Sequence, residues 1–334
     1  MGVVVLKRLM LITLVTIFCM CTALQSNRAA AEPPQWTQHR MIAHAMGGIS
    51  GAEYTNSYEA FVVNYEKGHR VFEVDLILTG DGKLAARHDW LPYTADLLKQ
   101  SLPEDRIGES LNLREFKSAQ ILEKYKPLSF RDVAKLMQQY PDIYIVTDTK
   151  ETDVALVRKQ FEYIRQIANE VEPSILERLI PEIYTPQMYD AVMEIYAFPN
   201  LLYSLYLSDE PVAQTVQFVT DHQIRTVAMP VERVSLIPEL ASALHKAGVK
   251  IYTHTVNSQE EIQTLSEKGV YGVYTDFLPN RSRYFTGAVQ ALSSIESETS
   301  EFADFWKDSR MFIMVFLLML AFFMYRNRQM ERLH

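Results

Sequence analysis

The chain has 334 residues, of which 48% are hydrophobic and 22% are charged, a balance that is ordinary for a globular protein. This length accommodates one barrel domain of about 250 residues with further segments at its ends. Without residues 1–31 and 311–334 the chain keeps 27 basic and 40 acidic residues, a net charge near −13. So acidic a domain is a poor nucleic-acid binder and is repelled by anionic membrane surfaces, which excludes nucleic acid as a partner.

The N-terminal segment, residues 1–31, has the pattern of a secretory signal peptide. Lys7 and Arg8 precede an apolar run over residues 9–24, and three alanines at 29–31 form a small-residue cleavage site. An uncleaved signal anchor is the alternative, because the apolar run is somewhat long. Both cysteines, Cys19 and Cys21, fall in this run, so the remaining domain can form neither a disulfide nor a cysteine-ligated metal site.

Apolar runs alternate with amphipathic stretches through the middle of the chain, as in α/β proteins. Asn56 and Glu59 form a capping box that predicts a helix start. We predict strands near residues 41–45, 71–78, 83–88, 143–148, 179–184, 201–207, 226–229, 250–256 and 272–275. We interpret 83–88 as an accessory strand paired with its predecessor, which leaves eight main strands. The sequence therefore predicts an α/β (β/α)₈ TIM barrel over residues 38–282.

The second predicted strand carries two carboxylates on one face. Glu73 and Asp75 are two residues apart, so both side chains leave the same side of an otherwise apolar strand. Buried acids of this kind cost several kcal/mol unless a cation or hydrogen bonds compensate them. With Asp148, at the end of the 143–148 strand, they form a hard oxygen site suited to Ca²⁺ or Mg²⁺ and not to zinc. A buried salt-bridge network is the alternative interpretation.

Histidines lie at the ends of the first and third predicted strands. In a parallel barrel the catalytic groups project from the C-terminal strand ends, and His44 and His88 occupy such positions. Histidine titrates in the range needed to activate a hydroxyl and to protonate a leaving alkoxide. The other histidines are expected to line the pocket (His254) or to lie on the surface (His69, His222 and His245).

Two tyrosines share a strand face with a polar residue near a strand end. Tyr252 shares a face with His254, and Glu182 shares one with Tyr184. Tyrosines in such positions line polyol or sugar pockets, but they are as often core residues with a satisfied hydroxyl. We therefore expect Tyr252 and Glu182 as candidate substrate contacts, with a core position as the equal alternative for the tyrosines.

The segments outside the barrel are expected to attach the protein to a membrane. Residues 89–126 have little periodicity and are interpreted as a lid or rim. We predict a juxtamembrane stalk over 283–310, a transmembrane helix over the apolar residues 311–325, and a basic cytoplasmic tail over 326–334. Basic residues flank both terminal apolar segments on their outer sides, so the positive-inside rule places both termini in the cytoplasm and the barrel outside it. We therefore expect a cell-membrane protein with an extracytoplasmic domain, and a buried terminal helix is the alternative.

Several short motifs follow one another in a fixed order. They are His44-Ala45-Met46-Gly47, Asn56-Ser57, Glu73-Val74-Asp75, His88-Asp89, His254-Thr255-Val256-Asn257 and Gly272-Val273-Tyr274-Thr275-Asp276. In this order the chain resembles the glycerophosphodiester phosphodiesterase family, whose superfamily includes phosphatidylinositol-specific phospholipase C. The resemblance covers residues 41 to 280 and implies a phosphoric diester hydrolase of glycerophosphodiester or phosphopolyol type.

The resemblance also implies roles for individual residues. His44 and His88 would transfer protons, Lys150 would be the catalytic cation, and Glu73, Asp75 and Asp148 would hold a divalent metal. A hydroxyl next to the phosphate would act as internal nucleophile and give a cyclic phosphate, which water opens in the hydrolases. The partner is then a small-molecule or lipid-derived phosphodiester.

Two positions depart from the family pattern together. The Arg of the family's His-Arg-Gly is Ala45, and the Glu of its Pro-Glu-Asn-Thr is Thr55. Because a cation and an anion that lie near each other in relatives are both lost, we interpret the change as a matched replacement. Lys150 is the best substitute cation for a bound phosphate and Arg87 the second. An outward-facing Arg87 is the alternative, because it neighbours His88 on an alternating strand. The changes leave two alternatives open, a non-catalytic ligand-binding barrel and an envelope polysaccharide phosphodiester transferase.

Overall fold

The computed structural model describes residues 35–100 and 108–285, so the predicted segments 1–31, 311–325 and 326–334 lie outside the described residues. The chain divides into two units, residues 1–37 and 38–334, and the second contains the barrel. Among the helices that are described, none is both long enough and apolar enough to cross a membrane.

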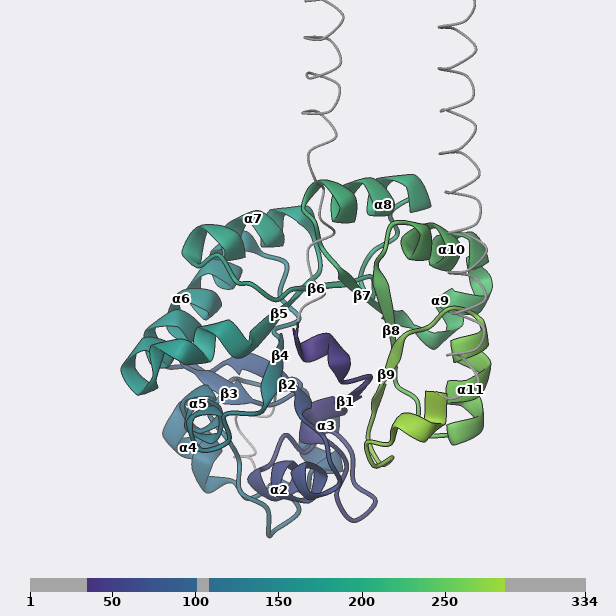
Figure 1. The fold of residues 1–334 in the computed structure, drawn as a ribbon. Helices are drawn as coiled ribbons and strands as arrows, with labels where there is room; N and C mark the ends of the chain where they lie inside the picture. Colours follow the sequence, from purple (N-terminus) through teal and green to yellow (C-terminus); the bar gives the residue numbers. More distant parts are fainter. Residues whose placement is uncertain (1–34, 101–107, 286–334) are drawn as a thin grey trace, which may run out of the picture. The chain divides into compact units, whose positions relative to one another are not determined.

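Eight parallel strands close into a barrel, which Figure 1 shows in the centre of the domain. The sheet closes because β1 pairs with β9 on one side and with β2 on the other. A short ninth strand runs antiparallel to the end of β2, with Leu76 opposite Ala86, as predicted for the accessory strand. The strands are β1 (Met41–Ala43), β2 (Val71–Leu78), β3 (Leu84–Ala86), β4 (Tyr144–Asp148), β5 (Leu179–Ile183), β6 (Leu202–Ser204), β7 (Thr226–Pro230), β8 (Lys250–His254) and β9 (Gly272–Thr275).

Helices cover the outside of the barrel between successive strands (Figure 1). Several begin at capping side chains, for example Asp153 before α6 and Ser258 before α11, which satisfy the first free backbone N–H groups. The helices are α2 (Tyr58–Glu66), α3 (Pro92–Leu97), α4 (Leu113–Ser118), α5 (Phe130–Gln139), α6 (Val154–Val171), α7 (Pro186–Ile195), α8 (Val212–Asp221), α9 (Val231–Leu236), α10 (Pro238–Lys246) and α11 (Gln259–Glu267). Short 3₁₀ turns are η1 (Gln35–Gln38), η2 (His44–Met46), η4 (Pro173–Arg178) and η5 (Ser282–Phe285).

The strand register brings the predicted acids to one level of the barrel. Asp75 of β2 pairs with Asp148 of β4, and Glu73 lies two residues below Asp75. Strands β2 and β4 are buried along almost their whole length, because the core surrounds them on both faces. Glu73 and Asp75 are each only 1% exposed, so the fold removes both carboxylates from bulk water.

The structure corrects three local expectations. The N-cap of α2 is Ser57 rather than Asn56, because the Asn56 side chain bonds Asp75 instead of the helix. His69, expected at the surface, is 1% exposed and contacts the backbone carbonyl of Leu278. Tyr284 and Phe285 are buried in the barrel core, so the first residues of the predicted 283–310 stalk belong to the domain.

Candidate active site

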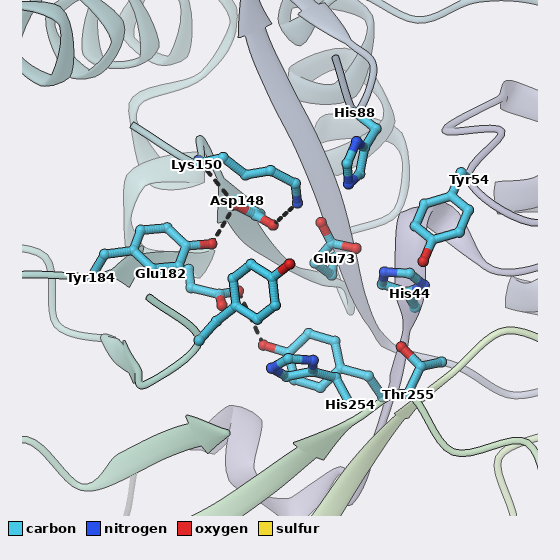
Figure 2. A pocket seen from close by; sticks show the side chains of 12 residues that line it. His44, Tyr54, Glu73, His88, Asp148, Lys150, Glu182, Tyr184, His254 and Thr255 are labelled. Carbon is cyan, nitrogen blue, oxygen red and sulfur yellow. Dashed lines mark hydrogen bonds and ion pairs between the residues drawn. The ribbon is translucent and has the colours of Figure 1, made fainter. Parts of the chain in front are cut away.

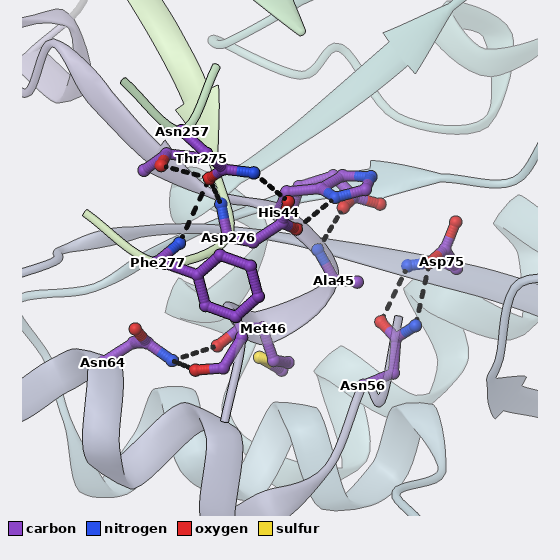
Figure 3. Close-up of polar contacts among 12 residues, drawn as sticks. His44, Ala45, Met46, Asn56, Asn64, Asp75, Asn257, Thr275, Asp276 and Phe277 are labelled. Carbon is purple, nitrogen blue, oxygen red and sulfur yellow. Dashed lines mark hydrogen bonds and ion pairs between the residues drawn. The ribbon is translucent and has the colours of Figure 1, made fainter. Parts of the chain in front are cut away.

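The loop after β1 fixes His44 against a carboxylate from the end of β9. His44 Nδ1 lies 2.8 Å from Asp276 Oδ1, and the second oxygen of Asp276 accepts a 2.7 Å hydrogen bond from Asn257 Nδ2 (Figure 3). Burial lowers the pKa of His44, but the hydrogen bond and the charge of Asp276 outweigh it, and the net shift is upward. The Asp276 contact occupies Nδ1 and leaves Nε2 of the ring for a bound molecule.

The same loop holds the two acids of β2. The backbone N–H of Ala45 donates to Glu73 Oε2 at 2.6 Å, and Asn56 Nδ2 donates to Asp75 Oδ2 at 2.8 Å. Asn56 Oδ1 accepts a 3.1 Å hydrogen bond from the Asp75 backbone N–H. The Asn56 side chain therefore bonds both the side chain and the backbone of Asp75 (Figure 3). Ala45 and Asn56 both adopt positive φ, of 48° and 46°, a strained backbone that aims these donors at the carboxylates.

The end of β4 supplies the third acid and a lysine. Lys150 Nζ lies 2.7 Å from Asp75 Oδ1 and also contacts Asp148, which accepts a further 2.5 Å hydrogen bond from the Tyr184 hydroxyl. Burial lowers the pKa of Lys150, but the charges of Asp75 and Asp148 raise it well above its usual value, so the side chain is an ammonium. Burial would raise the pKa of Asp75, and the facing Lys150 lowers it to about 2.

The three carboxylates fit a divalent cation. One ligand oxygen from each of Glu73, Asp75 and Asp148 lies within 4.8 Å of the others. Glu73 Oε1 is buried without a hydrogen-bond partner, and burial with the charges of Asp75 and Asp148 raises the Glu73 pKa well above its usual value. The Lys150 ammonium compensates one of three negative charges. A hard cation would satisfy both the orphaned oxygen and the remaining charge.

His88 approaches the acids from the opposite side of Tyr54. The Tyr54 ring packs edge-on against His44 at 5.0 Å and against His88 at 5.3 Å between ring centroids, so one tyrosine spaces the two imidazoles (Figure 2). His88 Nδ1 lies 2.6 Å from Asp89 Oδ2, a histidine–carboxylate pair like that of His44. Each imidazole therefore has one nitrogen fixed by an acid.

A cavity of about 150 Å³ opens between these groups, at the C-terminal ends of the strands. Figure 2 shows its labelled side chains converging from several strands on one space. His254 and Glu182 line it as predicted; burial and then the charge of His44 lower the pKa of His254 to about 4, whereas burial and Asp148 raise that of Glu182 to about 7. The lining residues are His44, Tyr54, Glu73, His88, Asp148, Lys150, Glu182, Tyr184, Tyr206, His254, Thr255 and Tyr274.

Comparison with known proteins identifies the family of this chain. A model of the glycerophosphoryl diester phosphodiesterase family matches residues 48–279. The chain belongs to this family. It is therefore a hydrolase of phosphoric diesters. A glycerophosphodiester phosphodiesterase of Bacillus altitudinis is 22% identical over 254 residues, which cover 73% of this chain and 96% of that protein.

Solved structures of the family share the fold. A phosphodiesterase of Oleispira antarctica, determined with the product sn-glycerol-3-phosphate, superposes with a TM-score of 0.60 at 16% identity, covering 75% of this chain and 96% of the other. A glycerophosphodiester phosphodiesterase of Thermotoga maritima gives a TM-score of 0.54 at 20% identity, over 71% and 94%. At these identities the likeness establishes the TIM barrel and not the substrate.

The two departures from the family motifs are neighbours in this structure. Ala45 and Thr55 are both buried, and the backbone carbonyl of Ala45 accepts a 3.1 Å hydrogen bond from the N–H of Asn56. The Thr55 hydroxyl lies 3.1 Å from that of Ser57 instead of facing a cation. The Asn56 hydrogen bond therefore brings the two changed positions into one part of the loop, and the matched replacement stays a prediction.

Arg87 and Tyr252, which we predicted to contact substrate, do not line the pocket, and the structure corrects both predictions. The Arg87 guanidinium donates to the backbone carbonyl of Asp89 and to Gln100, and it stacks on Trp90 at 5.3 Å. The Tyr252 hydroxyl donates a 3.1 Å hydrogen bond to the backbone carbonyl of His39. His39 precedes β1 and therefore lies at the opposite end of the barrel. Arg87 turns away because β3 ends at Ala86, and Tyr252 lies one layer below His254.

Residues that the family motifs contained, but to which we assigned no role, complete the site. Asp276 and Asn257 end the downstream motifs and orient His44, while Asn56 orients Asp75. The sequence signal that could have identified these three residues is their position within the family motifs. Tyr206, on the loop after β6, carries no motif, and only the folded structure places it at the pocket beside His254, with 5.7 Å between their rings.

Proposed function

We propose that the protein is a metal-dependent hydrolase of glycerophosphodiester or phosphopolyol substrates that uses His44 and His88 for acid–base catalysis. The observation that carries the proposal is the pairing of His44 with Asp276 beside the Glu73, Asp75 and Asp148 cluster. A base, an acid and a concentrated anionic site that fits a cation are the parts that phosphodiester cleavage requires.

The two histidines take different roles because their surroundings differ. Asp276 and Asp75 raise the pKa of His44 against the effect of burial, which favours the protonated ring and suits it to act as the acid. His88 takes the proton of the hydroxyl next to the phosphate; the hydroxyl oxygen bonds to phosphorus, and the bond from phosphorus to the leaving oxygen breaks. His44 gives its proton to that oxygen.

Water then completes the reaction with the roles reversed. Neutral His44 takes a proton from water, the water oxygen bonds to phosphorus, and the ring P–O bond of the cyclic phosphate breaks as His88 returns its proton. Lys150 neutralises charge on the phosphoryl oxygens from the end of β4. A divalent cation held by Glu73, Asp75 and Asp148 would supply further stabilisation of that charge.

Product release from a panel of glycerophosphodiesters and phosphatidylinositol tests this proposal. The full-length protein would be incubated with EDTA, Ca²⁺ or Mg²⁺, beside His44→Gln, His88→Gln and the surface variant His222→Gln. We expect metal-dependent release that falls about 10²–10⁴-fold in the first two variants and is retained in the third. Equal product release in EDTA would contradict the metal dependence. Equal rates in all variants would contradict acid–base catalysis by His44 and His88.

We further propose that the barrel lies on the extracytoplasmic side of a cell membrane. The support is the pattern of the sequence, in which basic residues flank both terminal apolar segments on their outer sides. Protease added to intact cells should then degrade the barrel. Degradation only after the cells are opened would place the domain in the cytoplasm instead.

A further inference from the structure

Large apolar side chains are exposed mainly at one end of the barrel. All eight that the described residues expose belong to segments that leave the C-terminal strand ends, after β3, β4, β6 and β7. They are Leu91, Tyr93, Leu97, Val154, Leu156, Tyr206, Leu207 and, at the end of α9, Leu236. Exposed apolar groups that gather around one opening indicate an interaction surface.

Two groups of these residues flank the pocket opening. The α3 lip consists of Leu91 (59% exposed), Tyr93 (73%) and Leu97 (42%), and it begins three residues after His88. The β6 lip consists of Tyr206 (58%) and Leu207 (51%), and Tyr206 itself lines the pocket. Strands β4 and β5 separate the bases of the two lips around the barrel, so the lips stand on different sides of the opening.

Both lips are held by buried contacts, so their exposed side chains keep a defined position. Below the α3 lip, Trp90 packs edge-on against Phe116 and donates 2.9 Å to the backbone carbonyl of Leu78. Below the β6 lip, the Arg233 guanidinium donates to the backbone carbonyls of Leu205, at 2.9 Å, and Ser208. The protein therefore presents these apolar groups to solvent on a fixed frame.

We propose that the two lips dock on a lipid surface with zwitterionic headgroups and that the pocket takes phosphodiesters from that surface. The inference rests on the proposed function for its substrate. A protein seated across both lips would close the opening through which substrate enters, whereas a lipid surface delivers the substrate to it. Tyrosine and leucine at a rim are the residues that enter the interface between headgroups and acyl chains.

The charges beside the lips select the headgroup. Exposed Asp96 flanks the α3 lip, Asp209 and Glu210 follow the β6 lip, and Asp153 precedes Val154, while Lys99 is the exposed cation next to Leu97. This excess of carboxylates repels an anionic surface and attracts the ammonium group of a zwitterionic lipid. The acidic domain as a whole acts in the same direction.

Site-directed fluorescence tests the docking without depending on turnover. Full-length protein lacking Cys19 and Cys21 would carry an environment-sensitive dye at Leu91→Cys, at Leu207→Cys or at the control Lys246→Cys, which is exposed before β8 at the other end of the barrel. After reconstitution into zwitterionic vesicles, a lipid-borne quencher should quench the first two dyes and not the third. Because the position of the dye is measured, any membrane anchor elsewhere in the chain does not produce this result.

Each other outcome contradicts the proposal in a distinct way. If water-soluble iodide quenched the lip dyes and the lipid quencher did not, as expected at Lys246, the lips would face water. Dyes that neither quencher reaches would show that a second copy or another segment of this chain covers the lips. Equal or stronger quenching in anionic vesicles would overturn the choice of headgroup.

Turnover separates failure of this inference from failure of the proposed function. Leu91→Asp and Leu207→Asp should lower turnover of a vesicle-borne phosphodiester about tenfold more than turnover of water-soluble glycerophosphodiesters. Lys246→Asp, a change at an exposed position at the other end of the barrel, should leave that ratio unaltered. An equal loss on both substrates would contradict the lipid surface, and absence of turnover on either would contradict the proposed function alone.

Discussion

His44 and His69, two histidines at opposite ends of the barrel, have opposite surroundings. At the C-terminal end His44 contacts the carboxylate of Asp276, and its pKa is raised; toward the N-terminal end His69 contacts the backbone carbonyl of Leu278, and burial lowers its pKa to about 4. The backbone differs in the same sense. Ala45 and Lys150 take positive φ at the pocket, whereas Gly248 and Gly269 take it in turns that lead into strands at the other end.

This contrast separates function from stability within one fold. The pocket end concentrates charge and backbone strain, both of which cost stability and are kept where chemistry needs them. At the opposite end, glycine supplies left-handed backbone in two of the turns that lead into strands, at Gly248 and Gly269, which favours the folded state. Substitutions at the pocket end should therefore affect turnover, and substitutions at the opposite end should affect the free energy of unfolding.

Among the substitutions that compare the two ends of the barrel, Glu73→Gln should give the largest effect on turnover. The change removes one of three clustered carboxylates, so we expect turnover to fall about 10²–10³-fold and the affinity for Ca²⁺ or Mg²⁺ to fall with it. The midpoint of thermal unfolding without added metal should stay equal or rise, because a buried charge is lost. Calorimetric titration with both cations, kinetics and unfolding would measure this, with the surface variant Glu66→Gln as control. A fall in the unfolding midpoint with unchanged metal affinity would assign Glu73 to stability.

Asp276→Asn should reduce turnover about a hundredfold and move its pH dependence. Without the hydrogen bond and charge of Asp276, the pKa of His44 falls. Since His44 acts as the acid, the alkaline limb of the kcat profile should shift to lower pH. Kinetics from pH 5 to 9 would measure the shift, beside Asp89→Asn at the other histidine pair. A uniform loss with an unmoved profile would mean that Asp276 only supports the local fold.

His69, at the opposite end of the barrel, should contribute to the acid sensitivity of folding, beside His254 in the pocket, whose pKa is also lowered to about 4. His69 has a pKa of about 4 when folded against 6.5 as its ordinary value, so between these pH values the unfolded chain binds more protons than the folded one. The free energy of unfolding should therefore fall as the pH drops through this window, by about 3 kcal/mol in full. Urea unfolding at pH 7, 5.5 and 4.5 would measure the slope. His69→Gln should reduce the slope, while the surface variant His222→Gln should not; an unchanged slope in His69→Gln would contradict this assignment.

The sequence predicts the local parts of this structure and misses those that depend on distant contacts. The two-residue spacing of Glu73 and Asp75 fixes their common face, and parallel pairing brings Asp148 beside them. By contrast, 232 residues separate His44 from Asp276, and no local pattern gives their contact. The prediction for Tyr252 rests on strand alternation, which gives the side of a strand but neither its end nor the layer of the barrel. The prediction for Arg87 rests on the missing family Arg, and alternation beside His88 instead favours the outward position.

Removing one hydroxyl oxygen at each end of the barrel should give the smallest effects, and it compares the two ends most directly. Tyr252→Phe removes the hydroxyl that contacts the backbone carbonyl of His39, and it should lower the free energy of unfolding by about 1 kcal/mol with turnover unchanged. Tyr274→Phe removes a hydroxyl that donates a 3.2 Å hydrogen bond to Glu182 inside the pocket. This substitution should alter kcat or KM. Urea unfolding and kinetics on both variants would measure the pair. If Tyr252→Phe raised KM while leaving stability intact, the hydroxyl would reach substrate after all, and the division between the two ends would fail at this layer.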